Sequence, residues 1–358
     1  MKIVIFPKSD NPYQNLLYQQ EPFDKFHFEY LNYYRSGSEL VNRVMLFISI
    51  VNFRLRGFKF FHLHWFFVFV SQPDSKLVRL LNTVYIPIFL IFIRLLGFKL
   101  VWTVHNVVPH EKTSLNDWWL TFFTYKISNA VIVHSRETLS ILQSNYGAGA
   151  HSYVIPMGHE IVKAQPTQNE ARSALGIENE RYVLLFFGLI KPYKGITGLI
   201  SVFNYFKKIA PNAHLYIVGD CQDKLHLVKL KLMAKQNKNI TLITRSVSDP
   251  VLSYFIAAAD CTVFPFKSVT SSSSVLRALI QSRAVIAPKI GALTDLPENV
   301  GYFYMKQGLG GLLQAMTSAY NDSQGNESVG LNGHLYMSKF NWQRSAQRTS
   351  RVFFDVRS

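Results

Sequence analysis

The sequence predicts an α/β protein built from two parallel-sheet domains. Short apolar runs typical of buried strands alternate with helix-like segments along most of the 358 residues. A polar, turn-rich stretch around residues 155–180 interrupts this alternation once. Alternating strands and helices form parallel sheets with helices on both faces, and a chain of this length exceeds one ordinary core. We therefore expect two Rossmann-like domains.

Nine apolar runs are predicted to be strands, and helical segments such as GITGLISVFNYFKKIAP connect them. The strands are expected at residues 2–6, 58–65, 99–106, 129–135, 182–188, 213–220, 239–245, 259–266 and 284–289. The last segment has helical spacing, with Trp342, Ala346, Thr349 and Phe353 on one face. The expected domains are residues 1–160, residues 161–337, and a C-terminal helix at 338–358 that either caps the second domain or crosses back to the first.

Composition excludes several classes of protein. Hydrophobic residues make up 48% of the chain and charged residues 17%, so a disordered chain is excluded. The two cysteines, Cys221 and Cys261, support neither a disulfide framework nor a zinc cluster. The opening MKIVIFP is typical of a strand and has no small-residue cleavage site, so we expect no signal peptide.

The net charge of +16 indicates an anionic partner. Nine Lys and Arg against two acids lie between Arg35 and Lys99, among many aromatic residues. Basic and bulky apolar residues together are typical of a surface that enters a lipid interface, and we assign Arg54, Arg56, Phe60 and Phe61 to such a surface. Aromatic residues also stack on bases, but no nucleic-acid-binding motif is present, so we expect no nucleic acid partner.

Residues 80–98 are the one candidate for a transmembrane helix. The uninterrupted apolar run, Val84 to Ile93, is shorter than the roughly 20 residues that a span requires. Pro87 and Arg94 lie inside the wider window. We expect a buried or interface-facing helix, in a protein that lies on a membrane without crossing it.

The stretch FFGLIKPYKG combines a strand end with two lysines. Gly188 ends a buried run, Lys191 and Lys194 follow, and Gly195 opens a helix-like segment. Backbone N–H groups at a helix start favour a phosphate, and lysine adds a positive charge. This pattern predicts a diphosphate site; a solvated basic turn is the plainer interpretation.

A hydroxyl-rich stretch stands between a strand and a helix. It consists of Thr270, Ser271, Ser272, Ser273 and Ser274. A helix N-cap needs only one such residue, so five in a row indicate a second part of the anion site.

The stretch VWTVHNVVPHEKT ends another buried strand with His105, and His110 and Glu111 follow in a loop. A lone histidine here is usually a core residue, but two histidines and a carboxylate beyond a strand end indicate acid–base chemistry. No further ligand has suitable spacing for a metal.

Together these motifs resemble glycosyltransferase family 4 and its relatives of GT-B architecture. The resemblance rests on FFGLIKPYKGI, AHLYIVGD, LSYFIAAADCTVFPF and AVIAPKIGALTDL in the second half, and on WTVHN, NAVIVHS and VIPMGH in the first. FNWQRSAQRTSRVF resembles the family's C-terminal helix, which returns to the first domain. The resemblance covers nearly the whole chain and implies two domains facing a central cleft.

The resemblance also implies sugar transfer from a nucleotide diphosphate donor, GDP- or UDP-linked, without a metal or cofactor. Lys191 and Lys194 would neutralise the leaving diphosphate, and His105 would lie near the transferred sugar. Many family members carry two glutamates eight positions apart, but this chain has Val269 and Arg277 there. That departure points to divergent bacterial exopolysaccharide enzymes and leaves the ribose contact unassigned.

We therefore expect a peripheral enzyme at the cytoplasmic face of the inner membrane, with a polyprenyl-diphosphate-linked saccharide as acceptor. A non-catalytic transferase-like binding protein and a nucleotide-sugar epimerase of the same architecture remain alternatives. The resemblance leaves open whether the transfer retains or inverts the configuration at the anomeric carbon of the sugar. In the inverting case Glu111 or His105 could deprotonate the acceptor.

Overall fold

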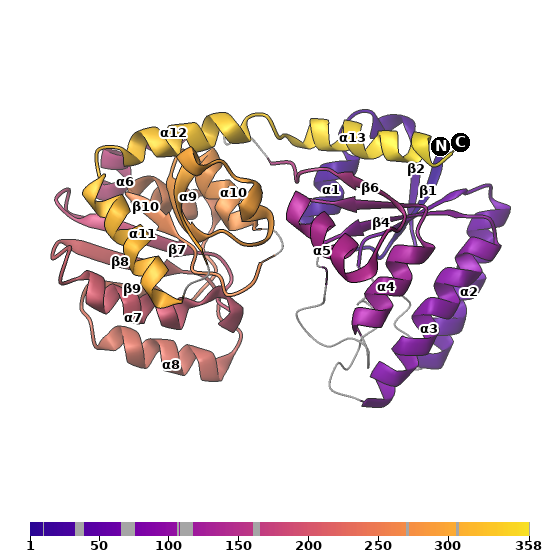
Figure 1. The fold of residues 1–358 in the computed structure, drawn as a ribbon, viewed down its shortest axis with the longest axis horizontal. Helices are drawn as coiled ribbons and strands as arrows, with labels where there is room; N and C mark the ends of the chain where they lie inside the picture. Colours follow the sequence, from indigo (N-terminus) through magenta and orange to yellow (C-terminus); the bar gives the residue numbers. More distant parts are fainter. Residues whose placement is uncertain are drawn as a thin grey trace. The chain divides into compact units, whose positions relative to one another are not determined.

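The computed structural model describes residues 1–9, 11–32, 39–65, 76–105, 107, 117–159, 165–269, 272–305 and 308–357. These residues form two compact units (Figure 1). Unit 1 contains Met1–Gly158 and Trp342–Ser358, and unit 2 contains His159–Asn341. The unit boundaries thus lie at 158/159 and 341/342, beside the expected 160/161 and 337/338.

The sheet of unit 1 has six parallel strands in the order β2-β1-β3-β4-β5-β6. Helices cover both faces. One face packs against α2, α3, α4 and α5, and the other packs against α1, the short helix η1 and α13. The strands are β1 (Lys2–Phe6), β2 (His27–Tyr30), β3 (Phe60–Leu63), β4 (Lys99–Val104), β5 (Ala130–Val133) and β6 (His151–Val154). The helices are α1 (Pro12–Tyr18), η1 (Phe23–Lys25), α2 (Glu39–Leu55), α3 (Lys76–Leu95), α4 (Asp117–Ile127), α5 (Arg136–Tyr146) and α13 (Trp342–Asp355).

The sheet of unit 2 has six parallel strands in the order β12-β11-β10-β7-β8-β9. Its strands are β7 (Tyr182–Phe187), β8 (Ala213–Val218), β9 (Ile240–Ile243), β10 (Cys261–Val263), β11 (Ala284–Pro288) and β12 (Gly301–Tyr304). Its longer helices are α6 (Gln168–Leu175), α7 (Ile196–Phe206), α8 (Lys224–Lys235), α9 (Asp249–Ala258), α10 (Ser273–Ile280), α11 (Leu309–Asn321) and α12 (Asn326–Met337). Three short 3₁₀ turns are η3 (Pro192–Lys194), η4 (Gly291–Asp295) and η5 (Glu298–Val300). The two Rossmann-like folds predicted from the sequence are therefore confirmed.

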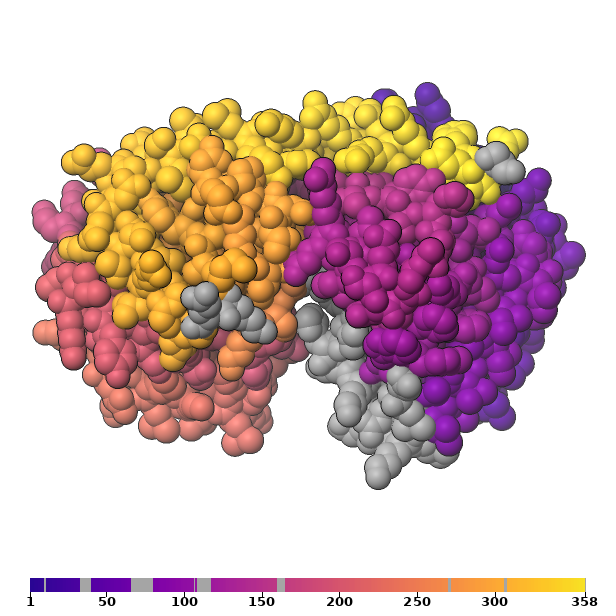
Figure 2. Space-filling model, viewed as in Figure 1, coloured from indigo at the N-terminus to yellow at the C-terminus, as the bar shows by residue number. Residues whose placement is uncertain are grey.

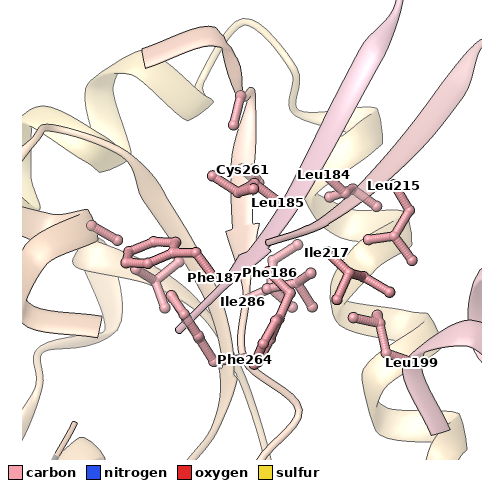
Figure 3. Packing of buried hydrophobic residues seen from close by; sticks show 14 of the residues in the cluster. Leu184, Leu185, Phe186, Phe187, Leu199, Leu215, Ile217, Cys261, Phe264 and Ile286 are labelled. Carbon is pink, nitrogen blue, oxygen red and sulfur yellow. The ribbon is translucent and has the colours of Figure 1, made fainter. Parts of the chain in front are cut away.

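Strand β7 lies at the centre of the unit 2 core. All six of its residues are buried, which is typical of a parallel strand covered by helices on both faces. Phe186 and Phe187 pack against Phe264, which follows β10, with ring centroids 6.1 and 5.3 Å apart (Figure 3). This packing holds the carboxyl ends of β7 and β10 together.

The structure contains a strand at each of the nine expected places and three more, β2, β6 and β12. All three additional strands lie at sheet edges and are mostly half-exposed. An edge strand needs no continuous apolar run, so its sequence pattern is weaker, although the edge strand β9 was predicted. The polar stretch expected at 155–180 contains the short helix α6, which Thr167 and Glu170 cap reciprocally.

The C-terminal helix α13 packs on unit 1, as the resemblance implied. Trp342, Ala346, Thr349 and Phe353, predicted to share a face, are all buried in that unit. In the space-filling view the helix, coloured yellow, lies along the surface of unit 1 (Figure 2). The Ser345 hydroxyl donates to the Pro156 carbonyl at 2.9 Å. This hydrogen bond holds the helix against the segment after β6, where the first part of unit 1 ends.

The assignment of Phe60 and Phe61 to a membrane surface is wrong. Both residues lie in the central strand β3 and are 4% and 0% exposed. Of the two arginines grouped with them, Arg54 donates from Nε to the Leu96 carbonyl at 2.6 Å, and Arg56 pairs with Glu29. The aromatic run looked like a surface because a buried parallel strand and a membrane-facing segment are both rich in phenylalanine.

Helix α3 covers most of the segment weighed as a transmembrane candidate. Within the described part of the chain, no helix has the length and apolar character needed to cross a membrane.

Candidate functional site

The loop between β7 and α7, Gly188 to Gly195, begins with a close approach of three chain segments. Gly188 has φ +113°, and a Cβ there would lie 2.6 Å from the Ser274 hydroxyl oxygen. A Cβ on Gly219, just after β8, would lie 2.0 Å from the Gly188 carbonyl oxygen. Only glycines allow the ends of β7 and β8 and the start of α10 to come this close.

The same loop ends against the segment after β10. Gly195 has φ +75°, and a Cβ there would lie 2.0 Å from the Pro265 carbonyl oxygen. The Lys267 N–H donates to the Tyr193 carbonyl at 2.9 Å. Gly195 is also the N-cap of α7, and no side chain caps this helix. The first amide groups of α7 are therefore left to other acceptors, water or an anion.

Lys194 lies on this loop with its ammonium group against aromatic rings. Its Nζ is 4.5 Å from the centroid of Phe266 and 5.5 Å from that of Tyr193. Burial lowers its pKa to about 8. No carboxylate pairs with Lys194 in the described part of the chain, so a bound anion would find an uncompensated charge. Lys191, three residues earlier, is half-buried at the start of η3.

The serine run divides into a helix cap and residues left for other contacts. Ser272 is the N-cap of α10, and its hydroxyl accepts from the Val275 N–H at 3.3 Å. Ser273 is exposed, and Ser274 lies against Gly188. Thr270 and Ser271 lie outside the described residues. One hydroxyl thus suffices for the cap, as expected.

Arg277, which stands where family members carry a glutamate, serves the fold of unit 2. Its Nη1 is 2.7 Å from Asp249 Oδ1, and its Nη2 is 3.2 Å from the Asp249 carbonyl oxygen. These contacts tie α10 to the start of α9. The ribose contact stays unassigned.

At the corresponding edge of unit 1, four histidines form a cluster with Tyr18. His64, His105 and His134 directly follow β3, β4 and β5, and His62 lies on β3. Parallel strands end at the same edge, which brings these rings together. We call His62, His64, His105 and His134 the histidine cluster.

Hydrogen bonds connect three of the histidines in a row. The Tyr18 hydroxyl is 2.6 Å from His62 Nδ1 and 2.7 Å from His64 Nε2. His62 Nε2 is 2.8 Å from the Thr103 hydroxyl. His64 Nδ1 is 3.1 Å from His105 Nε2. The row therefore runs from Thr103 through His62, Tyr18 and His64 to His105.

The fourth histidine, His134, makes a separate contact. Its Nδ1 is 2.9 Å from the Ile155 carbonyl oxygen, whereas its Nε2 is buried without a hydrogen-bond partner. Its ring centroid is 5.5 Å from that of His105 and 5.4 Å from that of Tyr13. A buried polar atom left unpaired costs about 1–3 kcal/mol.

Burial keeps the histidine cluster neutral. It lowers the pKa of His62 to about 3, and it lowers the pKa of His134. For His64 and His105, burial and the neighbouring histidines hold the pKa well below its usual range. The described residues contain no group of three His, Cys, Asp or Glu side chains placed to hold a metal ion.

Known proteins share both the fold and part of the sequence. The family described as glycosyl transferases group 1 matches residues 167–299, which include the Gly188–Gly195 loop and Ser272–Ser274. A GDP-mannose:glycolipid 4-beta-D-mannosyltransferase of Xanthomonas campestris is 28% identical over 262 residues, 71% of this chain and 68% of that protein. Residues 167–299 therefore match a glycosyltransferase family, and the chain is similar in sequence to a glycosyltransferase over most of its length.

Other relatives agree with this family. A lipopolysaccharide 1,2-N-acetylglucosaminetransferase of Salmonella typhimurium is 25% identical over 230 residues, 61% of this chain and 60% of that protein. Sucrose-phosphate synthase from Thermosynechococcus elongatus superposes with a TM-score of 0.78 at 14% identity, covering 99% of this chain and 98% of its own. Anabaena HepE in complex with UDP and glucose gives 0.76 at 15% identity, covering 99% and 100%. These two structures establish the GT-B fold.

Of the predicted residues, the structure brings Ser274 against Gly188, and it brings Gly195 against Pro265, which follows β10. His105 lies at the other sheet, in unit 1. His110 and Glu111 lie outside the described residues. The roles assigned to these side chains stay predictions.

Sequence reasoning missed Tyr18, His62, His64 and His134. The signal for the histidines was present: FHLH places two of them on one face of a strand, and VHS ends a strand as VHN does. Tyr18 gave no such signal, because it comes from a short helix before β2 and joins the cluster only in the fold.

Proposed function

We propose that the protein transfers a sugar from a nucleotide diphosphate sugar to a lipid-linked saccharide. One observation carries this proposal. Within the matched glycosyltransferase domain, the Gly188–Gly195 loop places a half-buried, unpaired Lys194 beside the uncapped start of α7. An ammonium group and free amides at one place favour a diphosphate.

The donor diphosphate would contact Lys194, Gly195 and the first amides of α7. Lys191 and the hydroxyls of Ser273 and Ser274 are further candidates for donor contacts. During transfer the acceptor oxygen bonds to the anomeric carbon, and the bond from that carbon to the diphosphate breaks. Lys194 then stabilises the charge that grows on the leaving group. Thr270 and Ser271 are also proposed to contact the donor, and only the sequence supports their assignment.

His105 is the proposed acid–base group of unit 1, with His110 and Glu111 as further candidates. Its neutral ring has a lone pair to accept a proton, but its lowered pKa makes it a weaker base than an ordinary histidine, so acid–base work requires a bound substrate to raise that pKa. The donor is proposed to be GDP- or UDP-linked, because the similar Xanthomonas enzyme is named for GDP-mannose and the similar HepE structure contains UDP. The two enzymes similar in sequence are named for glycolipid and lipopolysaccharide substrates, which supports a lipid-linked acceptor.

A membrane surface is proposed on the outer faces of α2 and α3, in place of Phe60 and Phe61. The two helices pack side by side through Phe47, which contacts Tyr85, Phe89 and Phe92 (Figure 1). Their solvent-facing sides are apolar. We call the following residues the α2/α3 stripe, each at least 42% exposed: Leu40, Val44, Ile48, Leu55, Leu80, Leu81, Val84, Ile88, Ile91 and Leu95.

The charge of the two helices supports an anionic lipid surface as the partner. Arg43 of α2 is buried against α3 and cannot face a lipid, but Arg54 at the end of α2 is partly exposed, and the sequence of α3 contains three basic residues and no acid. Apolar side chains on one face with basic residues nearby are typical of helices that lie in a membrane interface. We propose peripheral binding at the cytoplasmic face of the inner membrane, in bacterial polysaccharide synthesis.

The test is an assay of the purified chain with GDP-mannose, UDP-glucose and UDP-N-acetylglucosamine. Each donor is incubated with and without a polyprenyl-diphosphate-linked glucose in liposomes. Sugar transfer to the lipid supports the proposal. Isomerised donor without acceptor would show an epimerase, and donor binding without any turnover would show a non-catalytic binding protein. EDTA is expected to leave the transfer rate unchanged, since we propose no metal in the reaction.

A further inference from the structure

The histidine cluster leaves two ring nitrogens open. In the described part of the chain, both nitrogens of His62 and His64 have hydrogen-bond partners, as do Nε2 of His105 and Nδ1 of His134. Nδ1 of His105 and Nε2 of His134 have none. These two rings lie side by side, with centroids 5.5 Å apart.

The backbone fixes the tautomer of His134. Its Nδ1 faces the Ile155 carbonyl oxygen at 2.9 Å, and a carbonyl can only accept a hydrogen bond. The proton of the neutral ring must therefore be on Nδ1. Nε2 then carries a lone pair and can only accept, yet it is buried with nothing to accept from.

The surroundings of this lone pair are neutral and aromatic. His105 and Tyr13 face the ring of His134, and Trp342 packs on Tyr13 with centroids 5.3 Å apart. A phosphate or carboxylate oxygen would be repelled by a lone pair and would find no positive charge among these rings. An O–H group is the partner that satisfies a buried neutral acceptor.

His105 can adapt to such a partner, because the row that ends at it has two consistent proton arrangements. The Tyr18 hydroxyl can donate to either His62 or His64. If Tyr18 donates to His62, His64 donates to Tyr18 and accepts from His105 Nε2, so that His105 Nδ1 is an acceptor. If Tyr18 donates to His64, His64 donates to His105 Nε2 and His105 Nδ1 carries a proton. His134 only accepts, whereas His105 can do either.

We propose that His134 Nε2 accepts a hydrogen bond from a hydroxyl group of the acceptor saccharide. This rests on the proposed function and adds an acceptor-binding residue to it. A sugar presents neighbouring hydroxyls, so one can donate to His134 while the next one meets the adaptable Nδ1 of His105.

Two substitutions test the roles of the two ring nitrogens of His134 separately. In His134→Asn the amide group can keep the donation to the Ile155 carbonyl but has no atom at the position of Nε2. In His134→Gln the amide group can reach the Nε2 position but gives up the contact with Ile155. The control is His214→Asn in unit 2, where a half-buried histidine contacts Thr241 at 2.8 Å.

The expected result is that His134→Asn melts at the wild-type temperature and raises KM for the lipid-linked acceptor about 10-fold, the loss of one hydrogen bond. KM for the donor stays unchanged. His134→Gln melts at a lower temperature but raises acceptor KM less. His214→Asn leaves both constants unchanged. If His134 is purely structural, His134→Asn should keep the wild-type acceptor KM and His134→Gln should show the larger change. A rise in the donor KM alone would overturn the assignment of His134 to the acceptor.

Nitrogen NMR of the ¹⁵N-histidine-labelled chain separates this inference from the proposed function. The free protein should show His134 neutral, with the proton on Nδ1, and adding the lipid-linked glucose should shift the Nε2 resonance. If the wild type transfers sugar but His134→Asn binds the acceptor normally and Nε2 does not shift, this inference fails and the function stands. If no transfer occurs but Nε2 still responds to the saccharide, the function fails and the hydroxyl site stands.

Discussion

At the carboxyl edge of the unit 1 sheet the residues of the candidate site have neutral rings, whereas at the unit 2 edge they are glycines, serines and a half-buried lysine. Both edges belong to six-stranded parallel sheets, although the strand orders of the two sheets differ. In unit 1 the strand ends carry His64, His105 and His134, which hydrogen bond to one another or to the backbone. In unit 2 glycine lets the backbone approach closely and leaves the Lys194 charge unpaired.

If the two proposed sites are right, the residue that follows each strand adapts the same kind of sheet to opposite kinds of ligand. An unpaired ammonium group and free amides favour an anion, such as a diphosphate. Neutral imidazoles favour hydroxyl groups, which donate and accept.

Replacing Lys194 by Ala should lower turnover more than donor affinity, because its contact with the diphosphate strengthens as the sugar–phosphate bond breaks. The expected loss is about 30- to 1000-fold in kcat, or roughly 2–4 kcal/mol. The measurement is steady-state kinetics at saturating donor. Lys208→Ala is the matched control, since Lys208 also lies over a ring, that of Tyr205 at 5.6 Å, but is exposed. Full activity of a folded Lys194→Ala protein would mean that the donor binds elsewhere.

Gly195→Ala should destabilise unit 2 far more than Gly176→Ala. Both glycines have positive φ, +75° and +66°, so both substitutions strain the backbone by about 1 kcal/mol. Only at Gly195 would the new Cβ meet a backbone atom, the Pro265 carbonyl oxygen at 2.0 Å. We expect a further loss of about 1–3 kcal/mol in the free energy of unfolding there, measured by urea denaturation. Equal losses in the two variants would mean that the Gly188–Gly195 loop shifts to accommodate the new Cβ at no further energetic cost.

Replacing Val84, Ile88 and Ile91 together by Asn should weaken binding to anionic liposomes by about 30- to 100-fold, since each half-exposed side chain contributes on the order of 1 kcal/mol. The measurement is sedimentation with liposomes at two salt concentrations. The control replaces Leu225, Val228 and Leu232 of α8, which are also exposed and lie near lysines in unit 2. If only the α8 variant loses liposome binding, the membrane surface lies on unit 2 and not on α2 and α3.

Stability should change with pH in a different window for each unit. A buried histidine has a folded-state pKa below the unfolded value of about 6.5, so below pH 6.5 the unfolded state binds more protons and stability falls. Each histidine that stays neutral should lower the free energy of unfolding by about 1.4 kcal/mol per pH unit in that range. Urea denaturation at pH 7.0 and 5.5 measures this, and His62→Gln should reduce the slope.

The same linkage between a shifted pKa and the free energy of unfolding applies to Lys194 at high pH. Its folded-state pKa is about 8, against 10.5 for the ordinary side chain. Between these values the unfolded state binds the extra proton, so stability of unit 2 should rise as pH increases from 8 to 10.5. Lys194→Met should remove this rise. An unchanged profile would mean that the lysine is better solvated than its contacts with Phe266 and Tyr193 indicate.

Much of the fold followed from the sequence because buried parallel strands leave a strong local pattern. The run YVLLFF is apolar at every position because both faces of β7 are covered, and any other role for such a run is rare. The edge strands β2, β6 and β12 were missed because a half-exposed strand tolerates polar residues. The same ambiguity explains why the membrane assignment of Phe60 and Phe61 was wrong, since an apolar run does not reveal which partner buries it.

The sequence by itself determined the two α/β domains, the glycine and lysine pattern of FFGLIKPYKG, and the one-sided helix that ends the chain. These are local properties, since each depends on spacing within a few residues. Only the tertiary structure decided that Gly195 meets Pro265, that Tyr18 joins two histidines of β3, and that His134 keeps an unpaired nitrogen beside His105. These contacts join residues far apart in the sequence: 29 positions for His105 and His134, 44 for Tyr18 and His62, and 70 for Gly195 and Pro265. No local pattern encodes them, because they arise where parallel strands that are distant in the chain end side by side.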